Sequence, residues 1–126
     1  MASIRTALRS PGWWVQFTGI GHGIFTAVIF KDELAEIGRA GFIDAVPMKG
    51  HRATAFWFLF ATPAMWVSGT LLRSAERSGD LKAQRAAGSV IATTGVIGAA
   101  AMPVSGFWLL VFTGLAALRR GLKPRE

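Results

Sequence analysis

Apolar residues in this chain gather in long stretches that short polar segments interrupt. Residues 53–72, ATAFWFLFATPAMWVSGTLL, are twenty consecutive positions without a charge. Residues 13–30 and 86–118 are also free of charged side chains and rich in apolar ones. An α-helix needs about 20 apolar residues to cross a bilayer. The pattern therefore predicts an all-α integral membrane protein.

The longest of these stretches, residues 86–118, exceeds one untilted crossing and is long enough for two short ones. Pro103 and Gly106 lie three residues apart within it, and this combination favours a turn. The alternative is one long kinked helix, which would give three crossings in the whole chain. We predict a bundle of four transmembrane helices at about 13–30, 53–72, 86–102 and 104–118.

Polar segments flank the first apolar stretch on both sides. A basic leader over residues 1–12 resembles the start of a signal peptide, but charged residues follow the apolar stretch directly and no cleavage site of small residues is present. We expect the stretch to be retained as the first helix. In the connection after it, Leu34 and Ile37 lie one turn apart, which predicts a short interfacial helix at about 32–40.

Composition supports a membrane class and excludes several others. Charged residues make up 17% of the chain, against about 25% in soluble domains. A length of 126 residues indicates a single domain, 1–126, with no room for a separate soluble catalytic module. The absence of cysteine excludes disulfides and thiolate chemistry. The net charge of +7 sits at the edges of apolar stretches rather than on one face, so no nucleic-acid partner is predicted.

The distribution of basic residues predicts the orientation in the cell membrane. Ten of the 14 Lys and Arg residues lie in the leader, in residues 73–85 and after residue 118. The first connection carries four basic residues, and four acidic ones offset them. Since basic flanks stay in the cytoplasm, both termini are expected there. Three crossings would place the basic tail outside, which is a further reason to predict four.

His22 is the only ionisable residue well inside a predicted span. Gly19 and Gly23 form a GxxxG pair beside it, and Gly95 with Ala99 gives the third span a similar edge for close helix packing. The structural interpretation is a neutral imidazole hydrogen-bonded to a hydroxyl on another helix. The functional one is acid–base chemistry or substrate contact. A lone histidine supplies one ligand, so no metal or haem site is predicted.

Aromatic residues open two of the spans on the predicted outer side. They are Phe56 and Trp57 in one and Phe107 and Trp108 in the other. One interpretation is an interfacial belt with core packing. The other is an outer pocket that binds a lipophilic molecule.

The glycine-flanked His22, the AFWF segment at 55–58 and the PVSGFW segment at 103–108 together resemble a family of small bacterial membrane proteins. The family has four helices and is classed only as a domain of unknown function. The resemblance covers nearly the whole chain. It implies the four-helix architecture and transfers no mechanism.

Two classes of function fit these features. The first is a non-enzymatic membrane protein: an accessory or assembly subunit, or a binder of a lipophilic molecule, with the lipid bilayer, partner membrane proteins or a second copy as partners. The second is a small enzyme or carrier for a lipophilic substrate, with His22 titrating and Ser105 assisting. We favour the first, because catalysis usually brings several perturbed groups together. No nucleotide or dinucleotide motif occurs, so no cofactor is predicted.

Overall fold

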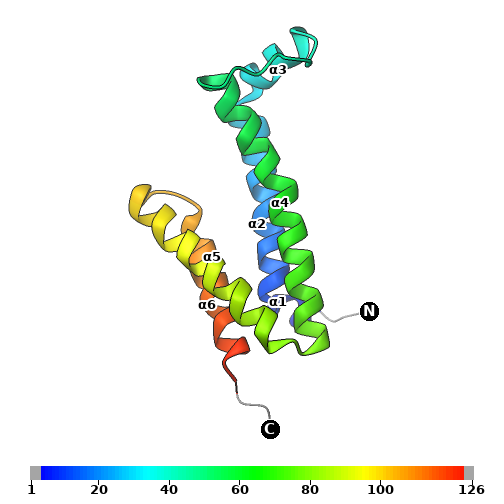
Figure 1. Cartoon of the computed structure of the whole chain (residues 1–126), viewed down its shortest axis with the longest axis vertical. Coiled ribbons are helices and arrows are strands. Elements are labelled where there is room, and N and C mark those ends of the chain that lie inside the picture. Colours follow the sequence, from blue (N-terminus) through cyan, green and yellow to red (C-terminus); the bar gives the residue numbers. More distant parts are fainter. Residues whose placement is uncertain (1–3, 124–126) are drawn as a thin grey trace. The chain divides into compact units, whose positions relative to one another are not determined.

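The computed structural model describes residues 4–123, and its regular structure is helical (Figure 1). The all-α prediction is therefore confirmed. Residues 102–106 separate the last two helices, so one long helix over 86–118 does not form. The helices of this part of the chain are α1 (Ile4–Leu8), α2 (Pro11–Ile29), α3 (Lys31–Arg39), α4 (His51–Ser78), α5 (Leu81–Ala101) and α6 (Phe107–Gly121).

The helices lie near their predicted ranges, and α4 differs most because it continues to Ser78 rather than ending at 72. Gly79 ends it with a positive φ of 70°, and the amide of Asp80 donates to the carbonyl of Ala75 at 2.9 Å. This 6→1 bond is the Schellman arrangement that satisfies the last carbonyls of a helix. Asp80 then accepts from the Ala83 amide at 2.9 Å and starts α5.

The prediction of four transmembrane helices is wrong. Within residues 4–123 only α4 is long and apolar enough to cross a membrane. α6 has 15 residues, which span about 22 Å against a hydrocarbon core of about 30 Å. α2 contains Gln16 and His22, and α5 begins with the polar segment LKAQR. A stretch without charges is therefore not equivalent to a stretch apolar enough for a span.

The chain divides into two compact units. The large unit comprises residues 1–16 and 67–126, and the small unit comprises residues 17–66. The large unit carries ten Lys or Arg residues and three Asp or Glu residues, whereas the small unit carries four of each. The net positive charge of the protein therefore belongs to the large unit. The single-domain organisation stays a prediction.

Within the large unit, α5 and α6 lie side by side (Figure 1) and touch through their backbones. A Cβ atom built on Gly88 would lie 2.3 Å from the backbone nitrogen of Leu118, and one on Gly114 would lie 2.3 Å from that of Ala92. No side chain fits at these distances. Small residues allow this approach, which gains van der Waals contact along the whole helix pair.

The core of the large unit is small and combines residues of α2, α4, α5 and α6. Val15 of α2, Leu72 of α4 and Ala117 of α6 are buried together, and Ala87 and Ile91 of α5 pack against them. No residue larger than leucine takes part in this cluster. The core therefore holds only a small share of the chain's bulky apolar side chains.

Most bulky apolar side chains point outward instead. Trp57 is 67% exposed. In the apolar window of α4 that could span a membrane, only 17% is buried. Exposed large hydrophobics occur on every long helix, and those of α2, α5 and α6 are Phe17, Ile20, Ile24, Phe25, Val28, Ile29, Val90, Val96, Ile97, Trp108, Leu109, Phe112 and Leu115. The helices thus have small residues inside and large apolar residues outside.

We predict that Gly88→Ala destabilises the large unit, because the new methyl group would overlap the backbone of Leu118. The expected loss is about 1–3 kcal/mol, the usual cost of overpacking, and would appear as a lower Tm in detergent. Gly21→Ala is the control: nothing lies within 4 Å of that position, and alanine favours a helix by about 1 kcal/mol over glycine. Equal Tm values for Gly88→Ala and the wild type would contradict the backbone contact.

Candidate functional site

His22 lies half-buried on α2 in the small unit, facing α4. Its Nε2 atom donates a hydrogen bond to the carbonyl oxygen of Phe58 at 2.9 Å, and its ring stacks on the Phe58 ring at a centroid distance of 5.3 Å. A carbonyl only accepts, so Nε2 carries a proton. In the neutral ring Nδ1 is then the acceptor nitrogen. The partner is therefore a backbone carbonyl and not the hydroxyl that the sequence led us to expect.

The backbone around this bond is unusual on both helices. α4 continues through Pro63, whose missing N–H removes the usual helical donor to the carbonyl of Leu59, next to Phe58. On α2, the fully buried Thr26 donates its hydroxyl to the carbonyl of His22 at 2.8 Å. The hydroxyl of Thr26 is thus satisfied within its own helix, whereas the His22 imidazole bonds to α4.

Gly19 and Gly23 face α4 on either side of His22. A Cβ on Gly23 would lie 2.8 Å from Cγ2 of Thr62, and a Cβ on Gly19 would lie 3.1 Å from Cβ of Met65. The buried hydroxyl of Thr62 has no hydrogen-bond partner in the described part of the chain. A buried hydroxyl without a partner costs about 1–3 kcal/mol. Both glycines therefore pack closely against α4, and the Thr62 hydroxyl lies at the contact with Gly23.

Of the aromatic residues at the start of α4, Phe58 contacts His22, whereas Phe56, Trp57 and Phe60 contact one another. Phe56 packs against Phe60 at 4.5 Å and against Trp57 at 5.6 Å between ring centroids. Phe30 joins the ring of Phe58 at 5.2 Å. Two small aromatic groups therefore occupy the small unit, one beside His22 and one on the outer surface of α4.

The second aromatic pair belongs to the large unit. Phe107 lies against α5, where a Cβ on Gly98 would meet its ring at 2.1 Å. Trp108 donates its indole N–H to the carbonyl of Pro103 at 2.9 Å. The outer pocket expected between this pair and the pair at 56–57 stays a prediction.

The side chain of Ser105 binds a backbone amide at the start of α6. Its hydroxyl accepts the amide N–H of Phe107 at 3.4 Å, at the end of the connection from α5. It lies in the large unit and His22 in the small unit, so the assistance expected from it stays a prediction. Gly95 approaches the backbone nitrogen of Val111, where a Cβ would come within 2.5 Å, and Ala99 is buried nearby on the same helix.

Sequence reasoning missed a polar cluster in the large unit that centres on Glu76. One carboxylate oxygen accepts the Gly12 amide at 2.8 Å, and the other accepts the hydroxyl of Ser10. Ser10 in turn accepts the Trp13 amide at 3.1 Å. A carboxylate at a helix N-terminus satisfies free amides and complements the positive end of the helix dipole. The Ser-Pro start of α2 was the available signal, but residue 76 had been assigned to a polar connection.

A second polar contact of the large unit joins the same two helices one turn further along. The buried Gln16 donates to the hydroxyl of Thr70 at 2.8 Å and accepts from Arg73 at 2.9 Å. Both sides of the Gln16 amide are thus satisfied, as burial requires. In the described residues, no three His, Asp or Glu side chains come together as metal ligands would.

We predict that Glu76→Ala lowers the stability of the large unit by about 1–2 kcal/mol, the scale of a lost helix cap. Amide exchange at Gly12 should accelerate at the same time. Glu36→Ala is the matched control, because Glu36 makes only an exposed contact with Arg52 at 3.9 Å, and such contacts contribute little. If both variants unfold at the same temperature, Glu76 is not the cap of α2.

Comparison with known proteins gives one match. The model of the family of unknown function DUF6463 matches residues 6–124. No curated protein and no solved structure matches the chain. The family description states no activity, so it transfers none to His22 or Ser105. The expected membership in a family of unknown function is confirmed, and the chain belongs to the family of unknown function DUF6463.

Proposed function

We propose that this protein is a non-enzymatic integral membrane protein, either an accessory or assembly subunit of other membrane proteins or a binder of a lipophilic molecule. The observation that carries the proposal is the outward orientation of its large apolar side chains. Soluble monomers rarely expose contiguous apolar patches above a few hundred Å². Here such side chains line α2, α4, α5 and α6, while glycine and alanine fill the contacts between helices.

α4 supports the proposal most directly. It passes the length and apolarity test for a span, and only 17% of that window is buried. The core helix of a soluble protein can be equally long and apolar, but most of its surface is buried inside the protein. Exposed tryptophan, leucine and valine side chains instead cover the outside of α4, as lipid contact would require.

α2 is proposed to lie in the membrane with α4. Its polar residues are turned inward, since Gln16 and Thr26 are buried and His22 bonds to Phe58 of α4. Its exposed side chains, among them Phe17 and Ile24, are apolar. The mean hydropathy of the α2 sequence averages over both faces of the helix. It therefore underestimates how apolar the outer face is. A multi-pass protein with both termini cytoplasmic then follows from the basic residues of the large unit.

The candidate catalytic groups support a non-enzymatic role. His22 is bonded to the Phe58 carbonyl and stacked on its ring, and Ser105 holds the first amide of α6. Both side chains thus have structural partners. The alternative, an enzyme or carrier in which His22 titrates, predicts a different response to substitution.

Membrane insertion is tested by placing a charge on the outer face of α4. Val67 is 54% exposed near the middle of that helix. Val67→Asp should shift the protein out of the carbonate-resistant membrane fraction, because a central aspartate costs about 3 kcal/mol on insertion. The matched control is Ile43→Asp, since Ile43 is 82% exposed in the connection before α4. Carbonate release of the wild type would contradict the proposal, as would unchanged membrane retention of Val67→Asp.

The role of His22 is tested by His22→Gln and His22→Leu. Glutamine keeps a donor for the Phe58 carbonyl but cannot titrate, whereas leucine removes the donor. We expect glutamine to preserve stability and function in a complementation assay, and leucine to lose about 1 kcal/mol, the scale of one hydrogen bond between membrane helices. A stable glutamine variant without function would support the enzyme or carrier alternative.

A further inference from the structure

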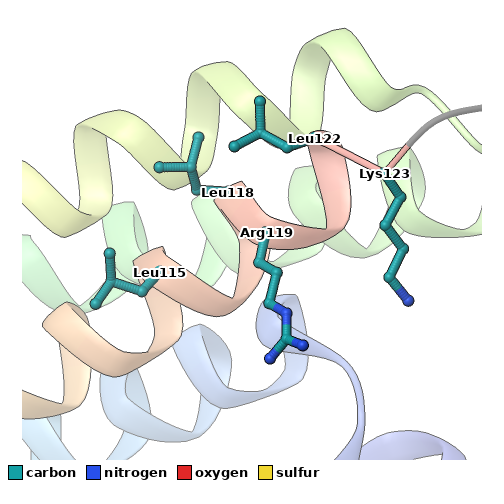
Figure 2. Close-up of a pocket in the computed structure, with 5 residues that line it drawn as sticks. All are labelled: Leu115, Leu118, Arg119, Leu122 and Lys123. Atoms are coloured by element: carbon teal, nitrogen blue, oxygen red, sulfur yellow. The ribbon is translucent and has the colours of Figure 1, made fainter.

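The cytoplasm-facing end proposed for the large unit carries an apolar groove on α6. Leu115, Leu118, Arg119, Leu122 and Lys123 line an open depression of about 470 Å³. In Figure 2 the three leucine side chains project to one side of α6, and Arg119 and Lys123 project to the other. None of the described residues that line the depression is acidic. It therefore presents an apolar strip bordered by two cations.

The spacing of these residues suits an amphipathic ligand. The leucines follow one another at intervals of three and four along the last turns of α6 and its C-cap residue, Leu122, so they form a strip about 10 Å long at 1.5 Å per residue. Arg119 lies beside the strip, between Leu118 and Leu122, and Lys123 directly follows Leu122. An acyl chain fits the leucine side, and an anionic headgroup fits the cations.

The acidic residues in the described part of the large unit are not placed to neutralise these cations. The unit has ten Lys or Arg residues against three Asp or Glu residues. Of the two acidic residues within its described part, Glu76 accepts from Ser10 and Gly12, and Asp80 accepts from Ala83. The carboxylates are thus engaged at helix starts. The charge around the groove is therefore positive in the described part of the unit, and an anionic ligand complements it.

A second depression in the same unit repeats this chemistry. Its wall combines apolar side chains from three helices with one cation, Arg9, and again includes no acidic residue: Leu8, Arg9, Pro11, Trp14, Leu109, Phe112, Thr113 and Ala116. Arg120, next to Arg119 on α6, donates to the carbonyl of Arg9 at 2.9 Å. The basic end of the large unit therefore combines apolar surface and positive charge at two neighbouring places on α6.

We propose that the α6 groove binds an anionic glycerophospholipid, with an acyl chain along the leucines and the phosphate at Arg119 and Lys123. Nucleic acid would use the positive charge but not the leucine strip. A zwitterionic lipid would use the strip but gain less from the cations. Because a lipid site presupposes the membrane location proposed above, the test measures membrane retention and lipid preference separately.

The test compares binding of phosphatidylglycerol and phosphatidylcholine to the purified protein in a neutral detergent, by native mass spectrometry and by the shift in Tm. The wild type should prefer phosphatidylglycerol. The double variant Arg119→Gln/Lys123→Gln should bind phosphatidylglycerol roughly thirtyfold more weakly, at about 1 kcal/mol per cation near an anionic surface. The matched control Arg39→Gln/Lys49→Gln removes the same charge from exposed positions of the small unit and should keep the wild-type preference.

The leucine strip is tested by Leu115→Ser/Leu122→Ser, which should weaken binding of phosphatidylglycerol but leave binding of glycerol phosphate unchanged. Equal affinity of the wild type for glycerol phosphate and for phosphatidylglycerol would overturn the proposal in favour of a free phosphate site. Equal loss in both double charge variants would overturn it in favour of general charge attraction. If the protein resists carbonate extraction yet shows no lipid preference, this inference fails and the membrane location stands. If carbonate releases the protein, the membrane location itself fails.

Discussion

Direct contact between helix backbones is the constraint on which the rest of this structure depends. At Gly88 and Gly114 the α5 and α6 backbones come so close that a Cβ atom would lie 2.3 Å from a neighbouring nitrogen. Gly12 and Gly69 do the same for α2 and α4 in the large unit, at 2.6 Å from backbone atoms of the opposite helix. Contacts this close leave no room for large side chains between the helices. Bulky apolar residues therefore have to lie on the outside.

That inside-out distribution has a consequence for stability. In water the hydrophobic effect would reward burial of the phenylalanine, tryptophan and isoleucine side chains that this fold leaves exposed. In lipid that reward disappears, and packing of small residues together with internal hydrogen bonds holds helices together. The polar contacts of Glu76, Gln16 and His22 fit the second situation, because each joins α2 to α4. Together these features explain why a chain with so small a core can form a defined fold.

The helix positions could be predicted approximately from sequence because charged residues bound the apolar stretches, but α4 and α5 continue into the charged segment between them. The break around Pro103 was visible as a turn signal, whereas the start of α5 at Leu81 lies five residues before the predicted start at about 86. The number of spans could not be predicted in this way, since α2 and α5 are free of charge over long stretches without being strongly apolar throughout. A stretch without charges can still be only weakly apolar. Here glycine, threonine and alanine make the uncharged stretches less apolar than a membrane span requires.

The candidate site was only partly predictable for a similar reason. Glycine spacing marked the face of α2 that meets α4, and His22 was identified from its position. Its partner was missed because the acceptor is the backbone carbonyl of Phe58, which no side-chain pattern identifies. Glu76 was missed because its position depends on α4 continuing past residue 72, and that follows from the cap formed by Gly79 and Asp80.

We propose that lipid covers the outer apolar surface of the helices. The native tryptophans can report directly on whether lipid or water surrounds them. Trp57, Trp66 and Trp108 are all exposed on helix surfaces. Their fluorescence should be measured with the protein in bilayers of phosphatidylcholine brominated along the acyl chains, and separately with iodide in the water phase. Strong quenching by the brominated lipid and weak quenching by iodide are expected. Strong quenching by iodide without an effect of the brominated lipid would show that water covers these helices, and would contradict the account.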